Sequence, residues 1–378
     1  MNVFSGRDSS VGRSAPYRLL GLSLAVIALL ATACGSGGGS SSAKPTPAGP
    51  GTIGLALPTT SPARWITDGK DLVAQFTSLG YRTDLRYADN DAGTQVSQLQ
   101  SMIHAGDKAL VVGAVDSTSL GDVLGEASRL GIAVIAYDRL IRETSAVNYY
   151  ATFDNFNVGV LQGSYIAEKL GLKAGKGPFT IELFAGSSDD NNSYFFFNGA
   201  MSVLEPYLRS GKLVVRSGQV AVKYALTPKW DPARAQSRLS GLLRSAYANQ
   251  RLDAVLAPND GIGLALVGTL TDAGYGTSTM PMPIVTGQDA DLTSVKSIIA
   301  NGQSQTVYKD FRQLAKITAE IADAELKGRT PPVNDTKSYD NGVEIVPSYL
   351  IKPVSVDRSN YESVLVKSAF YSAAQVGG

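Results

Sequence analysis

Two residue types that carry much of enzyme chemistry are almost missing from this 378-residue chain, which has one histidine and one cysteine. A single histidine cannot build a histidine-based metal cluster, and it is the one residue that could act as the base of a Ser-His-Asp triad. His104 itself falls at the end of a predicted helix, where a surface position is expected. A single thiol also excludes an internal disulfide. The sequence therefore predicts no metal site and no triad.

An excess of charge is also missing, since the formal net charge is only +1. Nothing in this balance calls for a nucleic-acid partner or an acidic surface. There is no Gly-x-Ser-x-Gly motif, and Gly175-Lys-Gly177 precedes a predicted strand, so it is a turn and no phosphate loop. No cofactor is expected. The pair Asp189-Asp190 leaves one alternative open, a secreted glycoside-processing enzyme, which would need a second placed carboxylate.

The first 33 residues have the features of an export signal. A basic leader is followed by an apolar run over residues 19–30 and by Ala31-Thr-Ala33 before Cys34. The run is too short to span a membrane, and L-x-A-T-A-C resembles the lipobox of bacterial lipoproteins. We expect residues 1–33 to be removed, Cys34 to be acylated, and residues 34–51, rich in Gly, Ser and Pro, to form a tether. The alternative is an ordinary secretory signal with an incidental thiol.

Beyond the tether, strand and helix patterns alternate, which predicts α/β lobes with doubly wound parallel sheets. The pattern runs from a strand at 52–57 to a strand at 132–137 and then restarts, so we expect two lobes of similar construction. The expected helices are 64–79, 93–105, 120–130, 158–170, 191–208, 233–248, 261–273 and 311–326, and the other expected strands are 81–88, 109–115, 148–152, 179–184, 213–216, 253–257, 283–286, 304–308 and 343–351.

The apolar run 132–137 is the most informative of these strands. It is rich in branched residues, as a strand buried on both faces of a parallel sheet would be. Asp138 and Arg139 follow it directly, at the rim where open α/β sheets bind ligands. On a strand end, neighbouring side chains diverge, so we expect the two to serve different ligand groups and to be partly unpaired without ligand. The alternative is a local salt bridge.

Most of the predicted strands end in polar residues of similar kind. Asn, Asp, Arg and Lys offer paired donors and acceptors, which suits the vicinal hydroxyls of a sugar. For Asp116, Asp154 and Asp260, helix capping is at least as good an explanation as ligand contact. The strand-end residues are Thr59-Thr60, Asp116, Asp138-Arg139, Asp154-Asn155, Asp189 to Asn192, Asn259-Asp260 and Gln288-Asp289.

Aromatic side chains would supply the apolar wall of such a site. Trp65 and Trp230 are the two tryptophans, and an indole face can lie on the C–H face of a pyranose. A core position is equally plausible for Trp65 and less so for Trp230, which precedes Asp231-Pro232, a predicted helix cap and first turn. Of the three successive aromatics 195–197, at least one should point to a cleft or an interface.

From about residue 52 to 369 the sequence resembles the periplasmic monosaccharide-binding proteins of ABC transporters, in the xylose-binding and multiple-sugar-binding branch. These proteins have the type I periplasmic binding protein fold. The motifs that carry the resemblance are S-P-A-R-W (61–65), A-Y-D-R-L-I (136–141), Y-Y-A-T-F-D-N (149–155), S-S-D-D-N-N (187–192), W-D-P-A (230–233), P-N-D (258–260), G-Q-D-A-D (287–291) and V-Y-K-D (307–310).

The resemblance implies a sugar site and a division into lobes. The implied sugar-binding residues are Arg64, Trp65, Asp138, Arg139, Asn191, Asn192, Trp230, Asn259, Asp289 and Lys309, with Asn192 preferred within the Asn pair. Three crossings near 153, 309 and 342 would give a first lobe of 52–153 and 309–341 and a second of 154–308 and 342–378. Thr59-Thr60 departs from the charged residues of xylose-specific members, which favours a multiple-sugar type.

The function implied is that of an exported, lipid-anchored binding protein on the outer face of the cytoplasmic membrane. It would be a non-catalytic monomer that takes up a monosaccharide such as xylose, glucose or galactose and delivers it to the ABC transporter permease. A sugar-responsive regulator with the same lobes is the runner-up. It would need a DNA-binding helix-turn-helix before residue 52, where the signal and tether stand.

Overall fold

The computed structural model describes residues 50–377. The expected signal segment, Cys34 and most of the expected tether lie outside this range. Among the helices it describes, none combines the length and apolar character needed to cross a membrane.

The first sheet has six parallel strands in the order β11-β5-β4-β3-β1-β2. In β4, Ala133, Ile135 and Tyr137 enter one core while Val134 and Ala136 enter the other, so the unbroken apolar run fills both faces. The strands are β1 (Thr52–Leu57), β2 (Arg82–Tyr87), β3 (Ala109–Val112), β4 (Ala133–Tyr137), β5 (Tyr149–Phe153) and β11 (Ser348–Ile351).

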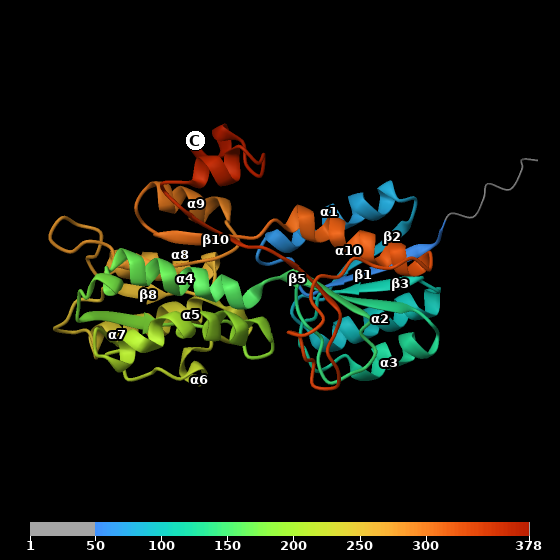
Figure 1. The fold of residues 1–378 in the computed structure, drawn as a ribbon, viewed down its shortest axis with the longest axis horizontal. Helices are drawn as coiled ribbons and strands as arrows, with labels where there is room; N and C mark the ends of the chain where they lie inside the picture. Colours follow the sequence, from blue (N-terminus) through green and yellow to red (C-terminus); the bar gives the residue numbers. More distant parts are fainter. Residues whose placement is uncertain (1–49, 378) are drawn as a thin grey trace, which may run out of the picture. The chain divides into compact units, whose positions relative to one another are not determined.

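Two pairs of helices cover this sheet, one pair on each face (Figure 1). α1 (Arg64–Ser78) and α10 (Phe311–Leu326) pack on one face, and α2 (Ala92–Ala105) and α3 (Gly121–Arg129) on the other. We call this sheet with its helices the first lobe.

The second lobe repeats the plan around four parallel strands in the order β7-β6-β8-β9. Its strands are β6 (Phe179–Leu183), β7 (Leu213–Val214), β8 (Ala254–Leu256) and β9 (Ile284–Val285). α4 (Asn155–Lys169) and α5 (Asn192–Arg209) contribute to one core, and α7 (Pro232–Arg244) and α8 (Asp260–Asp272) to the other.

Smaller elements complete the second lobe. An antiparallel pair is formed by β10 (Gln305–Tyr308) and β12 (Val354–Asp357). The remaining elements are α6 (Val222–Ala225), α9 (Leu292–Ile299), α11 (Ala373–Gly377), the 3-10 turns Leu172–Ala174 and Pro228–Trp230, and the π-helical turn Glu362–Val366.

Helices α4 and α5 approach each other at backbone distance because glycines stand where they touch. A Cβ atom on Gly159 would lie 1.9 Å from the carbonyl oxygen of Phe196, and one on Gly199 would lie 2.0 Å from that of Phe156. Only glycine leaves room for this contact. It fixes α5, whose first turns point toward the other lobe.

The chain passes between the lobes three times, after β5, after β10 and after β11. The expectation that the last crossing lies near 342 is wrong. Ser348–Ile351 pairs with β5 at the edge of the first sheet, and the Asn341 side chain donates a 2.8 Å hydrogen bond to the carbonyl oxygen of Thr144. The segment up to Ile351 therefore belongs to the first lobe, because its hydrogen-bond partners are there.

Candidate functional site

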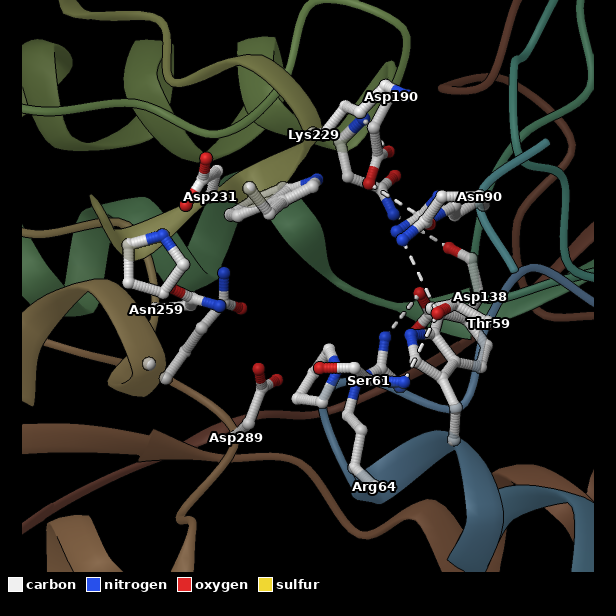
Figure 2. A pocket seen from close by; sticks show the side chains of 18 of the residues that line it. Thr59, Ser61, Arg64, Asn90, Asp138, Asp190, Lys229, Asp231, Asn259 and Asp289 are labelled. Carbon is white, nitrogen blue, oxygen red and sulfur yellow. Dashed lines mark hydrogen bonds and ion pairs between the residues drawn. The ribbon is translucent and has the colours of Figure 1, made fainter. Parts of the chain in front are cut away.

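A cavity of about 360 Å³ lies between residues of the two lobes, at the carboxyl ends of their strands. Figure 2 shows its labelled side chains around a central space, with Asn259 and Asp289 opposite Asn90 and Asp138. Such a volume is near the lower end of small-molecule pockets, roughly 300–1,000 Å³. Its position agrees with the rule that open α/β sheets bind ligands beyond their carboxyl ends.

The structure brings nine of the ten predicted residues into the lining of this pocket. They are Arg64, Trp65, Asp138, Arg139, Asn192, Trp230, Asn259, Asp289 and Lys309. Asn191 is the exception, because it stands at the cap position of α5 and only the next residue reaches the pocket. Asn259 has two tasks, since its Oδ1 accepts a hydrogen bond from the Ile262 N–H and caps α8.

Asp138 and Arg139 diverge, as the strand geometry predicts, and each pairs with another residue. Arg64 Nη2 donates to Asp138 Oδ1 at 3.0 Å, and Arg139 Nε lies 3.1 Å from Asp190 Oδ2. Arg139 Nε has no hydrogen-bond partner among residues 50–377, so Arg139 is partly unpaired as expected, whereas Asp138 is paired with Arg64. All four side chains are largely removed from water, where an isolated charge would be costly.

The protonation of these acids follows from burial and neighbouring charge. Burial raises the pKa of Asp138, but Arg64, Lys309 and Arg139 outweigh it, so this pKa lies below its ordinary value. Burial raises the pKa of Asp190 above its ordinary value despite Arg139. Asp138 is thus held as a carboxylate, the form that accepts hydrogen bonds from hydroxyl groups.

Direct hydrogen bonds tie the two lobes together beside the pocket. Between the lobes, Asn192 Nδ2 donates to the Asp138 carbonyl oxygen at 2.8 Å, Tyr150 Oη donates to Asn192 Oδ1 at 3.1 Å, and the Ser117 N–H donates to the Asp189 carbonyl oxygen at 3.0 Å. Within the second lobe, Asn155 Nδ2 donates to Asn192 Oδ1 at 2.9 Å. Most of the hydrogen-bonding capacity of the Asn192 side-chain amide is therefore used by protein groups, and these bonds fix the position of one lobe against the other.

Lys309 and Asp289 form the second charged wall of the pocket. Lys309 Nζ lies 2.8 Å from Asp289 Oδ1, and the two residues are only 3 % and 7 % exposed. The loop that carries Asp289 is anchored by Asp260, whose Oδ2 accepts from the Asp291 N–H at 2.8 Å and from Thr306 Oγ1 at 2.9 Å. Asp260 is therefore a structural acid beneath the site.

Trp230 provides an aromatic wall and packs on a glycine. A Cβ atom on Gly186 would lie 2.1 Å from the indole, so any side chain there would displace the ring. Phe196 meets the indole edge-on with ring centroids 6.4 Å apart. Trp230 Nε1 has no hydrogen-bond partner among residues 50–377. Trp65 belongs to both environments expected for it, since it lines the pocket and lies in the first core.

Backbone strain is concentrated around the pocket. Asn90, Asp138, Lys229, Trp230 and Asp289 are non-glycine residues with positive φ angles of 60°, 63°, 58°, 55° and 97°, and all five line the cavity. Each such conformation costs roughly 1–3 kcal/mol and persists where surrounding contacts enforce it. Left-handed residues gathered at one cavity indicate a ligand site.

Several lining residues are absent from the implied sugar-binding set, among them Asn90, Asp190, Phe196 and Lys229. Asn90 follows β2 in an Asp-Asn pair and so carried the same strand-end signal as the predicted residues. Asp190 stands inside the motif at 187–192, and Phe196 is the aromatic of the 195–197 run that reaches the cleft. Lys229 had no signal beyond its place next to Trp230.

The fold and site define a two-lobed binding protein for a small polar molecule, held between charged walls and one indole face. The chain belongs to the periplasmic binding protein family, because the model of the periplasmic binding protein domain matches residues 53–330.

Relatives place it in the sugar-binding branch of ABC transporter proteins. It is 57 % identical over 324 residues to the multiple sugar-binding periplasmic protein SbpA of Azospirillum brasilense, covering 86 % of this chain and 90 % of that one. It is 55 % identical over 326 residues to the multiple sugar-binding periplasmic receptor ChvE of Rhizobium radiobacter, covering 86 % and 92 %. A solved ABC transporter solute-binding protein from Clostridium phytofermentans, with bound β-D-glucose, is similar with a TM-score of 0.82 and 48 % identity, covering 86 % of this chain and 99 % of that one.

Proposed function

We propose that the pocket binds one aldose ring, with D-glucose as the first candidate and galactose and xylose as further ligands. As a member of its family, the protein is the monosaccharide-binding component of a sugar ABC transporter and not an enzyme. Glucose comes first because the similar solved protein holds it, and several sugars are proposed because close relatives are named for multiple sugars.

The observation that carries this proposal is the combination of an indole wall with donors and acceptors around one small cavity. Trp230 supplies the wall, while the carboxylates of Asp138 and Asp289 supply acceptors. Arg64, Arg139 and Lys309 supply donors. A pyranose has apolar C–H faces and a rim of hydroxyl groups that both donate and accept, so it matches each wall.

Residues of both lobes line the pocket, so a ligand that touches both stabilises the arrangement in which they face each other. The proposed partner is the permease of the transporter, to which the two lobes in this arrangement would present their joint surface. In this proposal Trp230 stacks on the sugar, and Asn192 contacts it with the part of its side-chain amide that is not bonded to Asp138. The other sugar contacts are made by Arg64, Trp65, Asp138, Arg139, Asn259, Asp289 and Lys309.

Isothermal titration calorimetry of the purified protein with glucose, galactose, xylose and the disaccharide maltose tests the proposal. We expect one-site binding of at least one aldose, tighter than any binding of maltose, because the proposed site serves a single ring. Trp230→Ala should weaken aldose binding by about 1 to 3 kcal/mol because the stacking surface is lost. Tyr224→Ala, at an exposed aromatic outside the pocket, is the control and should bind normally. No binding of any aldose would reject the function, and unchanged binding by Trp230→Ala would reject the stacking role.

We also propose that Cys34 carries the lipid that holds the protein at the outer face of the cytoplasmic membrane. Support comes from the sequence, where L-x-A-T-A-C places the thiol at the cleavage point of an export signal. Cys34→Ala should abolish labelling by a palmitate analogue and move the protein to the soluble fraction, because stable anchoring needs the acyl chains. Labelling or membrane association that survives the substitution would contradict the anchor.

A further inference from the structure

Asp68 is a buried acid that touches the binding machinery without lining the pocket. It stands on α1 one turn after Arg64, is 0 % exposed, and accepts a 3.0 Å hydrogen bond from Arg64 Nη1 through Oδ2. Its Oδ1 has no hydrogen-bond partner among the residues that the structure describes. A buried carboxylate with one unused oxygen calls for an explanation, because such atoms are costly.

The contact with Asp68 completes the fixation of Arg64. The guanidinium lies 3.9 Å from the ring centroid of Trp65 and 4.6 Å from that of Phe311, and its two Nη atoms donate to Asp68 and Asp138. Contacts with two rings and two carboxylates hold the planar guanidinium of Arg64 in one orientation. The remaining N–H groups of Arg64 are then available to a ligand in the pocket that it lines.

We infer that Asp68 is a positioning residue for sugar recognition, which acts through Arg64 and makes sugar affinity depend on its own protonation. This inference rests on the proposed sugar-binding function. Asp68 is not itself a ligand contact, since it is absent from the pocket lining.

The surroundings of Asp68 favour its neutral form. Burial raises the pKa of Asp68 to about 8, against the opposing charge of Arg64, while Asp138 and Asp289 raise it further and Lys309 lowers it. The charged or titratable groups around it are Arg64 and Asp71 on its own helix, Tyr87 at the end of β2, Tyr137 and Asp138 at the end of β4, Asp289 after β9, and Lys309 after β10.

A second cavity lies beside Asp68 and shares Arg64 and Asp289 with the sugar pocket. This cavity of about 470 Å³ is lined by Asp68 and Asp71 from α1 and by Asp291 and Arg312 from elsewhere in the chain. It reaches the surface at Thr67 and Thr293, which are exposed. Asp68 therefore has beside it a cavity whose rim is exposed.

The direction of the pH effect follows from the charge of Asp289, which comes from the other lobe. A sugar that holds the lobes together keeps the Asp289 carboxylate near Asp68, so binding raises the pKa of Asp68 and takes up part of a proton. Affinity is then greatest where Asp68 is protonated and falls as the pH rises toward and above 8.

Calorimetry with glucose from pH 6.5 to 9 tests the inference on the purified protein. We expect the dissociation constant of the unmodified protein to rise about three- to tenfold over this range, within the tenfold per pH unit that one proton allows. Asp68→Asn imitates the neutral acid, so its dissociation constant should stay near the pH 6.5 value throughout. Asp68→Ala removes the partner of Arg64 and should bind more weakly at every pH. Asp71→Asn, one turn further along α1, should keep the full pH dependence.

The melting temperature without sugar should be similar for the unmodified protein and Asp68→Asn at pH 6.5, which separates positioning from a loss of fold. A flat pH profile for the unmodified protein, or a Asp68→Asn variant that keeps the pH dependence, would overturn the inference while the sugar-binding function stands. Absence of any aldose binding by the unmodified protein would instead overturn the function.

Discussion

Lys309→Met is expected to weaken sugar binding by about 1.5 to 3 kcal/mol, because the pocket wall loses a charged hydrogen-bond donor to the sugar. It also leaves the buried carboxylate of Asp289 without its partner. The melting temperature of the sugar-free protein should fall as well, since the uncompensated charge is present in both states. Calorimetry for binding and thermal unfolding followed by circular dichroism measure the two effects.

A double variant separates the ion pair from the ligand contact. Lys309→Met with Asp289→Asn removes both charges, so most of the sugar-free stability should return while sugar binding stays weak. Lys316→Met is the control, because its pair with Glu320 is exposed on α10 and its loss should change little. Normal sugar affinity in the single variant, or a double variant no more stable than the single one, would contradict the role given to this pair.

Gly159→Ala is expected to destabilise the second lobe by about 3 kcal/mol, because the new methyl group would overlap the backbone of α5. No side-chain rotation can relieve this overlap, so α4 and α5 must separate and carry the pocket residues of α5 with them. Urea unfolding followed by circular dichroism measures the loss.

Gly268→Ala is the matched control, since it lies inside α8 and a Cβ atom there meets open space. It should raise stability by about 0.5 to 1 kcal/mol through helix propensity. Equal effects of the two substitutions would mean that the α4–α5 contact is looser than the structure has it.

The fold was largely predictable because its signals are local. Apolar runs such as 132–137 can be buried only between two layers, and the helix expected over 311–326 coincides with α10. The last crossing was misplaced because pairing of Ser348–Ile351 with β5 depends on a strand about 200 positions earlier in the chain, which no local pattern encodes.

The site was predictable where a residue follows a strand directly, as Asp138 follows β4, or closely, as Asp289 follows β9. Lys229 was not predicted as a lining residue because a backbone conformation with positive φ directs it to the pocket, and a lysine in the sequence does not indicate such a conformation. The pairing of Arg64 with Asp138 depends on how α1 packs on the first sheet, and that of Arg139 with Asp190 depends on how the lobes meet. Adjacent positions in sequence carry no information about partners 50 or more residues away.

The direct bonds between the lobes have a consequence for transport itself. Asn192, Asp190 and Ser117 each bond to a residue of the opposite lobe, so part of the free energy that brings the lobes together is independent of sugar. The apparent dissociation constant equals the intrinsic one divided by the fraction of unliganded molecules that already adopt this arrangement. Strengthening these bonds would lower the sugar concentration needed for capture and would also delay unloading at the permease. The range of sugar concentrations over which the importer captures sugar is therefore set partly by residues that bond to protein and not to the sugar.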